Sequence, residues 1–266
     1  MLIAQVTDTH LRAPGERGFH GRVDTAARLA QAVDYLNALA PAPDLVVLTG
    51  DLVDNGRPAE YDHLAAVLRP LKAPFLLIPG NHDLRDPLRA AFPDIARRAP
   101  GGFVHYAVDE LPVRIVALDS TEEGRVGGIL CAERLAWIEA TLAASKKPTV
   151  MLMHHPPYDY GVLPNEKMSC AKGADALGAI VAKHWQVEAI LSGHLHRATT
   201  VRWHGTVAST VPATAPMFEM RLGGQEPSGW LDTPPAVGLH LWRPGQGLVS
   251  HVATVAEPSA LVRFPA

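Results

Sequence analysis

The sequence predicts a layered α/β fold, and two features of its pattern carry that prediction. In the first half of the 266-residue chain, short apolar runs alternate with longer stretches of helical periodicity, as in βαβ units. After Gly101 and Gly102 the pattern becomes richer in strands, which favours a mixed sheet or two packed sheets. With 47% apolar residues, the chain is long enough for one large domain, or for one domain with an appended piece.

Three strands are expected in the first half, and a helix is expected after each of them. Residues 45–48 are continuously apolar, as in a strand that is covered on both sheet faces. Asp24 is expected to cap the first helix, and Pro58 to lie in the first turn of the second. The expected strands are 2–7, 44–49 and 75–78, and the expected helices are 24–39, 58–69 and 86–97.

The second half is expected to contribute mostly strands. His204 and Gly205 predict the turn of a hairpin. Residues 212–235 are rich in Pro and Gly and predict a long loop, which would suit a lid or an oligomer contact. The expected strands are 103–108, 113–118, 149–153, 188–191, 199–203, 206–210, 237–242 and 248–255, and the expected helices are 133–144 and 174–183.

Composition disfavours nucleic-acid polymers and membranes as partners. The formal net charge is −3 and the pI is about 6.5, whereas proteins that bind duplex DNA or bulk RNA usually carry a basic surface. No basic segment with a long apolar run opens the chain, and no run of 18 apolar residues occurs, so we expect neither a signal peptide nor a membrane partner. The two cysteines form no CxxC pair, which favours reduced thiols and a cytoplasmic protein.

Five short polar clusters each follow directly on an expected strand. Ligand sites in open α/β sheets form outside the carboxyl ends of the strands, so these clusters are expected to meet in one crevice. Two of them place candidate ligands two residues apart, which in an extended chain puts both side chains on one side. The clusters are Asp8-Thr9-His10, Gly50-Asp51-Leu52-Val53-Asp54, Gly80-Asn81-His82-Asp83, His154-His155 and Gly193-His194-Leu195-His196.

The clusters supply a set of candidate metal ligands that exceeds the needs of one tetrahedral ion. Two ions that share one carboxylate would suit the set, and mixed nitrogen and oxygen donors without thiolate favour Zn, Fe or Mn over Ca or Mg. Any one cluster alone is commonly a turn or a surface pair. All five together predict a metal site, although spacing does not decide between His154 and His155. The candidates are Asp8, His10, Asp51, Asn81, His154, His194 and His196.

The motif series resembles that of the calcineurin-like binuclear metallophosphoesterases. The motifs D-T-H, G-D-L-V-D, G-N-H-D, M-H-H-P-P and G-H-L-H match the family's motif series throughout, and they span residues 8–196. The opening M-L-I-A-Q-V-T-D-T-H, the stretch G-R-P-A-E-Y and M-H-H-P-P are most similar to a branch with bacterial glycerophosphodiesterases and class III cyclic-nucleotide phosphodiesterases. The resemblance implies an αββα sandwich of two mixed sheets flanked by helices. Residues 1–200 would form the catalytic core, and 201–266 C-terminal strands completing the sandwich.

The resemblance also implies a role for each motif residue. Asp51 would bridge two divalent or mixed-valence transition metal ions (Fe, Mn or Zn). One ion would be held by Asp8, His10 and His196, and the other by Asn81, His154 and His194. His82 would contact the substrate phosphate beside Asn81 and protonate the leaving oxygen. The non-ligand positions, expected to orient the ligands, are Asp54, Asp83 and His155.

The expected activity is hydrolysis of a small phosphodiester, such as cAMP or a glycerophosphodiester, by a metal-bound hydroxide. Two cations would neutralise the anionic diester and lower the pKa of bound water. Asp51 and His82 are the expected catalytic residues. Phe19 and His20 either line the substrate pocket or belong to a surface loop. Ser120 is expected to pack or to form a hydrogen bond, not to act as a nucleophile.

Three other functions are alternatives to this one. A broad-specificity phosphomonoesterase stays open, whereas the near-neutral charge argues against a nuclease. A non-catalytic scaffold would typically lack some of the ligands that are complete here. The resemblance also implies homo-oligomers through the C-terminal region, but Trp203, Phe218 and Trp230 equally suit the core or a lid.

Overall fold

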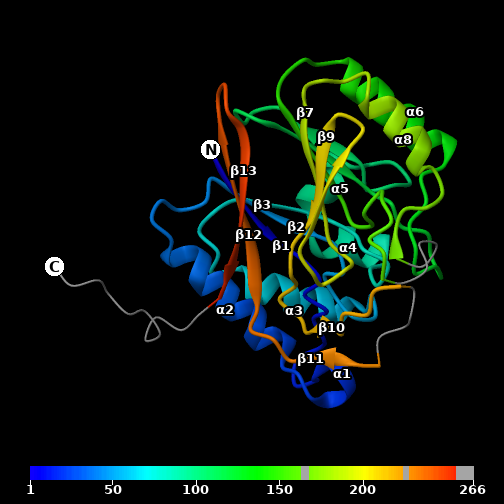
Figure 1. Cartoon of the computed structure of the whole chain (residues 1–266). Helices are drawn as coiled ribbons and strands as arrows, with labels where there is room; N and C mark the ends of the chain where they lie inside the picture. The colour runs from blue at the N-terminus through cyan, green and yellow to red at the C-terminus, as the bar shows by residue number, and fades with distance from the viewer. Residues whose placement is uncertain (163–167, 224–227, 256–266) are drawn as a thin grey trace.

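Two mixed β-sheets are stacked face to face, with helices on their outer sides (Figure 1). The computed structural model describes residues 1–162, 168–223 and 228–255. One sheet has the strand order β13-β12-β1-β2-β3 and the other β4-β5-β6-β7-β9-β8. The predicted αββα architecture is confirmed.

The three N-terminal strands of the five-stranded sheet, β1, β2 and β3, run parallel to one another. Helix α2 connects β1 to β2, and helix α3 connects β2 to β3. The side chain of Asp24 accepts a hydrogen bond from the backbone N–H of Ala27 and so caps α2 as predicted. Pro58 opens α3 as predicted. The elements are β1 (Leu2–Val6), α2 (Thr25–Ala38), β2 (Leu45–Thr49), α3 (Pro58–Leu68), β3 (Phe75–Ile78), α4 (Arg85–Ala91), α5 (Pro93–Arg98), β12 (Ala236–Arg243) and β13 (Gly247–Thr254).

The single helix expected over 86–97 is wrong, because the chain forms two helices there. Phe92 lies between α4 and α5 with φ −123° and ψ 79°, outside the helical region. Pro93 explains the break: proline disfavours a helical conformation of the preceding residue, has no N–H to donate and itself suits a first helical turn.

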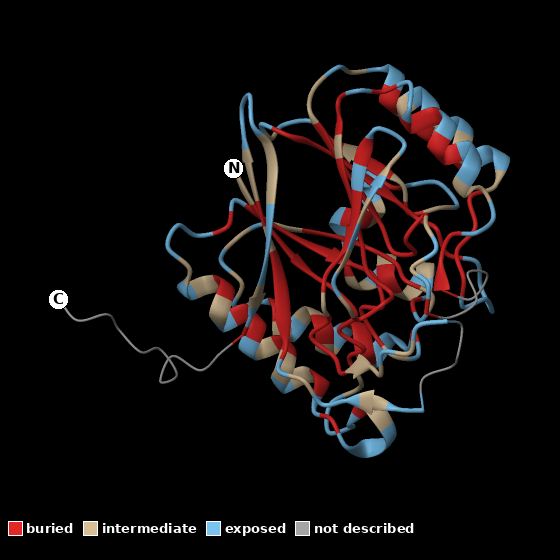
Figure 2. Cartoon of the chain, viewed as in Figure 1, coloured by how far each residue is buried: buried red, intermediate tan, exposed pale blue. Residues whose placement is uncertain are grey.

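The six-stranded sheet separates two apolar layers. Ile115 and Ala117 on β5 pack in the cluster that contains the first sheet, whereas Val116 and Leu118 pack with α6 and α8 on the other face. These central strands are buried along most of their length (Figure 2). The elements are β4 (Tyr106–Val108), β5 (Arg114–Leu118), α6 (Ala132–Ala143), β6 (Thr149–Met153), α8 (Ala174–Val181), β7 (Val187–Ser192), β8 (Thr199–Trp203) and β9 (Thr206–Thr210).

The segment predicted as a loop, 212–235, contains a small two-stranded sheet. Strand β10 (Met217–Phe218) pairs antiparallel with β11 (Trp230–Leu231), close to the short turn α1 (Gly18–Gly21) in Figure 1. Strands of two residues are too short to show a periodic pattern, so no local signal predicts them. Residues 224–227 of this predicted segment lie outside the described residues. Among the described helices, none is both long and apolar enough to cross a membrane.

A buried polar bridge joins the two sheets. The side-chain amide of Gln5 donates to Thr49 Oγ1 at 2.9 Å and to the Ser192 carbonyl at 2.8 Å. Its oxygen accepts from His240 Nε2 at 3.0 Å, and His240 Nδ1 accepts from the hydroxyl of Ser250 at 2.8 Å. Because each polar atom of the Gln5 side chain has a partner, the bridge fixes the spacing of the sheets.

The buried imidazole of His240 is expected to make the fold sensitive to mild acid. Burial, with the charge of His251 in addition, lowers the pKa of His240 to about 4. A histidine whose pKa is lower in the folded than in the unfolded state stabilises the fold fully above its ordinary pKa of about 6.5 and progressively less as the pH falls to 4. We expect this group to cost about 2 kcal/mol of unfolding free energy by pH 5. Urea titrations at pH 7.5 and pH 5 measure it.

The matched comparison is His240→Gln against His204→Gln, which changes an exposed turn residue. The first variant should lower stability at pH 7.5 but flatten its dependence on pH. The second should keep the wild-type slope. Equal slopes in the wild type and His240→Gln would show that this imidazole is not the titrating group.

Candidate metal centre

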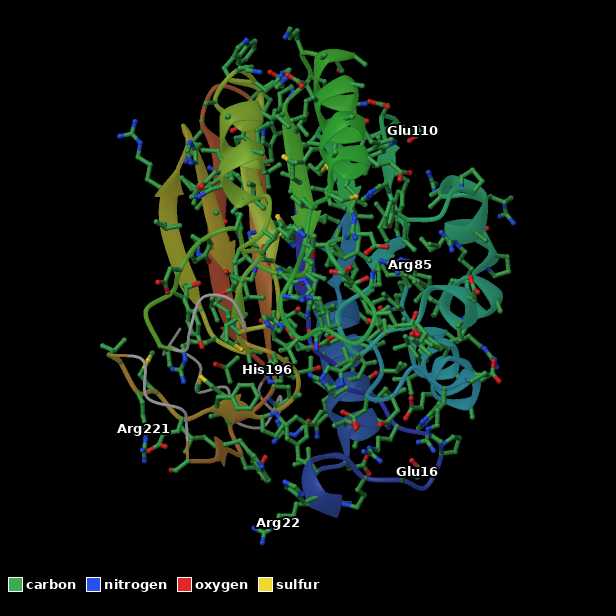
Figure 3. The ribbon with its side chains drawn as sticks, turned by 90° about the vertical axis from the view of Figure 1, so that its right-hand side faces the viewer. Glu16, Arg22, Arg85, Glu110, His196 and Arg221 are labelled. Atoms are coloured by element: carbon green, nitrogen blue, oxygen red, sulfur yellow. The ribbon has the colours of Figure 1, made fainter. Side chains whose placement is uncertain are left out.

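The five polar clusters meet at one edge of the stacked sheets. They follow β1, β2 and β3 of one sheet and β6 and β7 of the other. Across the sheets, the His154 ring donates to the Thr49 carbonyl at 2.8 Å, and the backbone N–H of His194 donates to Asp8 Oδ1 at 2.9 Å. Figure 3 places His196 inside the molecule, whereas Arg22 and Arg221 project outward at the same end. The structure thus brings the predicted ligand residues together.

Two imidazole nitrogens face each other in one half of the site. Nε2 of His10 lies 3.0 Å from Nε2 of His196. Nδ1 of His10 donates to Asp54 Oδ1 at 3.2 Å, and Nδ1 of His196 donates to the Pro216 carbonyl at 2.7 Å. In the neutral rings the facing Nε2 atoms therefore both carry lone pairs, which a cation between them would satisfy. Asp8 Oδ1 lies 3.5 Å from the same His196 nitrogen.

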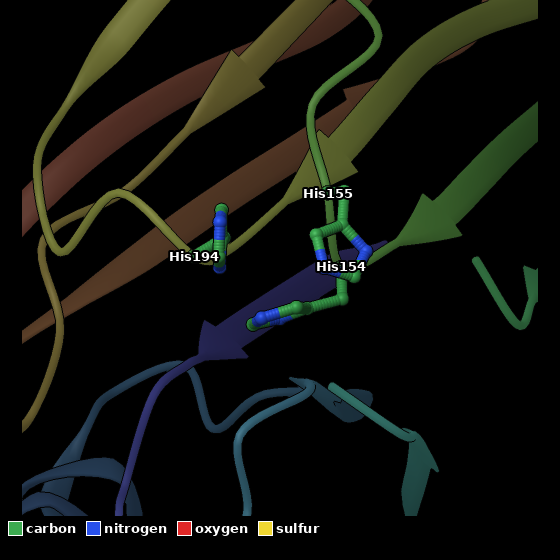
Figure 4. Close-up of side chains that lie close together, drawn as sticks. All are labelled: His154, His155 and His194. Carbon is green, nitrogen blue, oxygen red and sulfur yellow. The ribbon is translucent and has the colours of Figure 1, made fainter. Parts of the chain in front are cut away.

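The other half repeats this arrangement around His154. Because Nδ1 of His154 donates to a backbone carbonyl, its Nε2 is an acceptor in the neutral ring. That nitrogen lies 3.2 Å from Asn81 Oδ1 and 3.4 Å from Asp51 Oδ1, and the His194 ring lies 5.0 Å away between centroids (Figure 4). Three acceptors without a donor between them fit a bound metal ion.

Asp51 lies between the two halves. Its Oδ1 faces His154, and its Oδ2 lies 3.6 Å from Nε2 of His10. The Oδ1 atom also accepts the backbone N–H of His82 at 2.9 Å, which fixes the orientation of the carboxylate. A carboxylate with one oxygen toward each half has the geometry of a bridging ligand.

Both ring nitrogens of His155 are already engaged, although the ring lies beside those of His154 and His194 (Figure 4). Nδ1 accepts from the hydroxyl of Ser120 at 2.8 Å, and Nε2 donates to the Val126 carbonyl at 2.9 Å. His154 and His155 are adjacent in the sequence, so spacing alone does not decide which of them is the metal ligand. The geometry favours His154, whose free nitrogen faces the acidic groups.

Buried carboxylates attract positive charge to the site. Burial lowers the pKa of His154, but Asp51 and Asp8 outweigh it and raise that pKa to about 9. The pKa of His196 is also raised, since Asp8 outweighs the effect of burial. A metal ion that binds these nitrogens must therefore displace protons, so metal affinity should increase with pH.

Strained backbone accompanies the candidate ligands. Eight described residues other than glycine have a positive φ, and five of them are predicted ligands. The expectation that each Asp-x-His or His-x-His pair lies in extended chain is therefore wrong, although the side chains do converge. Strain of this kind persists only where the surroundings fix it, and it concentrates at functional sites. The five are Asp8 (φ 50°), His10 (φ 43°), Asp51 (φ 45°), His194 (φ 71°) and His196 (φ 50°).

Gly193 allows the two sheets to approach closely behind the ligands. A Cβ atom at this position would lie 2.1 Å from Thr7 Oγ1 and 2.7 Å from the Thr49 carbonyl. We expect Gly193→Ala to cost about 1–3 kcal/mol of unfolding free energy and to weaken metal binding by displacing Asp8 and His194. Denaturant titration and metal titration measure the two effects. Gly101→Ala is the control, since a Cβ there meets nothing within 4 Å, and equal behaviour of both variants would refute the argument.

Two further acidic side chains support the ligands from behind. Asp83 accepts backbone N–H groups from Leu52 at 3.0 Å, Val53 at 3.3 Å and Gly80 at 2.8 Å, so it ties the ends of β2 and β3 together. Asp54 contacts His10 and, at 2.6 Å, Arg12. Burial raises the pKa of Asp54, but these two partners outweigh it and lower the pKa to about 2.

His82 stands at the open side of the site. Its Nδ1 donates to the Asp54 carbonyl at 2.8 Å, its ring lies 4.7 Å from that of His10, and 39% of its side chain is exposed. Burial lowers its pKa, but Asp51 and Asp54 outweigh that and raise it. The ring is therefore fixed through one nitrogen and can accept or donate a proton with the other.

Two cavities of about 410 Å³ each border the site. The first is lined by His82, His10 and His196 together with Phe19 and His20, so the latter two residues lie at a pocket rather than on a separate loop. Phe218 from β10 lines the same cavity, which sequence analysis did not predict. The second cavity adjoins Asn81, and no sequence signal indicated it.

Stacked mixed sheets with histidines and aspartates gathered at one edge define a metallophosphoesterase fold. Residues 1–198 match the sequence profile of the family described as calcineurin-like phosphoesterase. The chain belongs to this family. Its histidine and aspartate clusters have the composition and spacing to bind metal ions.

Named relatives agree with this membership, and a solved structure shares the fold. The probable glycerophosphodiester phosphodiesterase GpdQ of Arcobacter nitrofigilis is 31% identical, over 97% of this chain and 94% of the relative. The 3',5'-cyclic adenosine monophosphate phosphodiesterase CpdA of Escherichia coli K12 is 31% identical, over 82% of this chain and 77% of the relative. A dimetal phosphatase from Danio rerio shares the fold with a TM-score of 0.68 at 16% identity, over 96% of this chain and 99% of that one.

Proposed function

We propose that this chain is a metal-dependent phosphodiesterase that hydrolyses small phosphodiesters. The observation that carries the proposal is the convergence of imidazole nitrogens and carboxylate oxygens around two adjacent positions, beneath a cavity that His82 borders. The printed names of the relatives, a glycerophosphodiester phosphodiesterase and a cyclic-nucleotide phosphodiesterase, support diesters as the substrate class.

The proposed ligand roles follow the two halves of the site. Asp51 would bridge, the first half would be Asp8, His10 and His196, and the second would be Asn81, His154 and His194. Bound transition metal ions, Fe, Mn or Zn, would neutralise the phosphate and lower the pKa of a coordinated water. Asp54, the Pro216 carbonyl and the Thr49 carbonyl hold the imidazoles by their other nitrogens and so fix which lone pairs point inward.

His82 would hold the proton that the leaving alkoxide needs. Its Nδ1 is occupied by the Asp54 carbonyl, which leaves Nε2 for the substrate in the cavity lined by Phe19 and His20. The carboxylates of Asp51 and Asp54 favour its protonated form. A positioned acid with a pKa near the working pH is the usual source of such a proton.

Further parts of the proposal concern the organisation of the chain. We propose a catalytic core over 1–200, with 201–266 completing the sandwich. For 212–235 we propose a lid or an oligomer contact, since Phe218 of this segment lines the cavity and Trp230 lies 5.6 Å from Phe19 between ring centroids. A homo-oligomer in the cytoplasm is part of the same proposal.

A substrate panel tests the function. Purified protein loaded with Mn, Zn or Fe(II) is assayed on cAMP, cGMP, glycerophosphocholine and glycerophosphoethanolamine, and on a matched chromogenic monoester and diester. We expect metal-dependent turnover of at least one natural diester and faster turnover of the chromogenic diester than of the monoester. A preference for the monoester would favour a phosphomonoesterase, and metal binding without any turnover would favour a scaffold. Either result would overturn the proposal.

A further inference from the structure

His155, which follows β6 of the six-stranded sheet, binds the surface segment 120–126. The ring is fully buried, and its two nitrogens contact opposite ends of the stretch 120–126, through the Ser120 hydroxyl and the Val126 carbonyl. Gly128 packs directly on the ring, since a Cβ at that position would lie 2.6 Å from Cγ of His155. The imidazole is thus enclosed by the segment that it binds.

The same segment forms one wall of the cavity beside Asn81. Residues 121–124 line that cavity, and α4 supplies the facing wall through Arg85, Asp86 and Arg89. Arg85 holds the near end of the segment, donating to the carbonyl of Thr121 at 2.9 Å and to its hydroxyl at 2.8 Å, and Arg134 donates to the same carbonyl at 2.8 Å. The stretch around Val126, beyond the cavity wall, is bound to the interior by His155.

The geometry points to His155 as a positioning residue that fixes residues 120–128 as the wall of a subsite for one arm of the diester. The inference rests on the proposed function. A phosphodiester carries two substituents on phosphorus, and the site has a cavity at His82 and another at Asn81. We infer that the two arms occupy these two cavities, and that His155 determines the shape of the second one without touching substrate.

Ser120 forms one of the two hydrogen bonds to the His155 ring, and it is not a nucleophile. Its side chain is fully buried. Its hydroxyl donates to His155 Nδ1 and accepts the backbone N–H of His155 at 3.3 Å. A hydroxyl that is buried and engaged in both directions has no path to a phosphorus atom at the metal site.

Three variants separate positioning from ligation. His155→Phe keeps the ring volume and removes both nitrogen contacts, His155→Gln restores a donor near the Val126 carbonyl, and Ser120→Ala removes one bond. Hydrogen exchange of amides 121–128 is measured on metal-free protein, together with metal content, kcat and KM for a diester. We expect the amides of this segment to exchange about tenfold faster or more in His155→Phe. A tenfold change corresponds to a free energy of local opening that is lower by about 1.4 kcal/mol.

The kinetic signature should be an effect on substrate binding. KM should rise at least about fivefold in His155→Phe, with kcat within about threefold of wild type and metal content unchanged. His155→Gln and Ser120→Ala should be intermediate. Combining Ser120→Ala with His155→Phe should add little, because the phenylalanine has already removed the hydrogen bond between Ser120 and residue 155. His251→Phe, on the exposed face of β13, should match wild type.

Two results would overturn the inference. Loss of metal from His155→Phe with unchanged exchange in 121–128 would make this histidine part of the metal centre. A fall in kcat at constant KM would make it part of the chemistry. If the wild type turned over no diester, the proposed function would fail separately, while the exchange data would still decide whether His155 positions the segment. Ser120→Ala, which removes a single oxygen, gives the same readouts if His155→Phe does not fold.

Discussion

Asp51→Ala is expected to lose metal and nearly all turnover. The two oxygens of this carboxylate face the two halves of the site, at 3.6 Å from His10 Nε2 and 3.4 Å from His154 Nε2. Its removal would deprive both halves of the carboxylate that they share, and of the negative charge that attracts cations to the imidazole nitrogens. Residues behind a metal ligand typically change affinity by about 10–100-fold, so we expect more than about 100-fold for this position. Elemental analysis and metal titration measure the loss.

The control is Asp62→Ala, which removes an exposed carboxylate from α3. It changes the net charge equally and should keep the wild-type metal content and rate. If Asp51→Ala retained two metal ions per chain and more than a tenth of wild-type turnover, Asp51 would not be the bridging group.

His82→Ala is expected to separate chemistry from metal binding. The ring lines the cavity, its Nδ1 is bound to the Asp54 carbonyl, and it is not one of the seven proposed ligands, so metal content should stay at the wild-type value. Loss of a general acid typically lowers the rate by about 10²–10⁴-fold. The loss should be greatest for diesters with alkyl leaving groups, whose alkoxides need a proton, and smallest for p-nitrophenyl esters.

A series of diesters with leaving groups of different pKa measures this dependence. His204→Ala, at an exposed turn, is the control and should follow the wild-type line. A His82→Ala enzyme that matched wild type on alkyl diesters would show that His82 does not supply the proton, whatever its effect on substrate binding.

Most of the fold was predictable because its strands are buried and short. The continuous apolar run of β2 and the hairpin turn at His204 and Gly205 lie where they were expected. The convergence of the ligand candidates was also predictable, since parallel strands direct their carboxyl ends to one edge. The rule applies once each cluster is placed directly after a strand, and it does not depend on how far apart the clusters are in the sequence.

Other features depend on contacts between distant residues and leave no local pattern. Gln5 and His240 are 235 positions apart, and nothing in either neighbourhood indicates that they bond. The left-handed backbone at Asp8 and His10 contradicts the extended chain that their spacing suggested. The break at Pro93, by contrast, follows from a local rule, because proline disfavours a helical conformation of the residue before it.

The placement of candidate ligands on both sheets has a mechanical consequence. Asp8 and Asp51 follow strands of one sheet, and His154 and His194 follow strands of the other, so each ion bound there would cross-link the two layers. A ligand that binds only the folded chain at 100 times its dissociation constant adds about 2.7 kcal/mol of stability. Chelation would therefore loosen the sandwich along the plane between its sheets, and the melting temperature of the protein would report the free metal concentration around it.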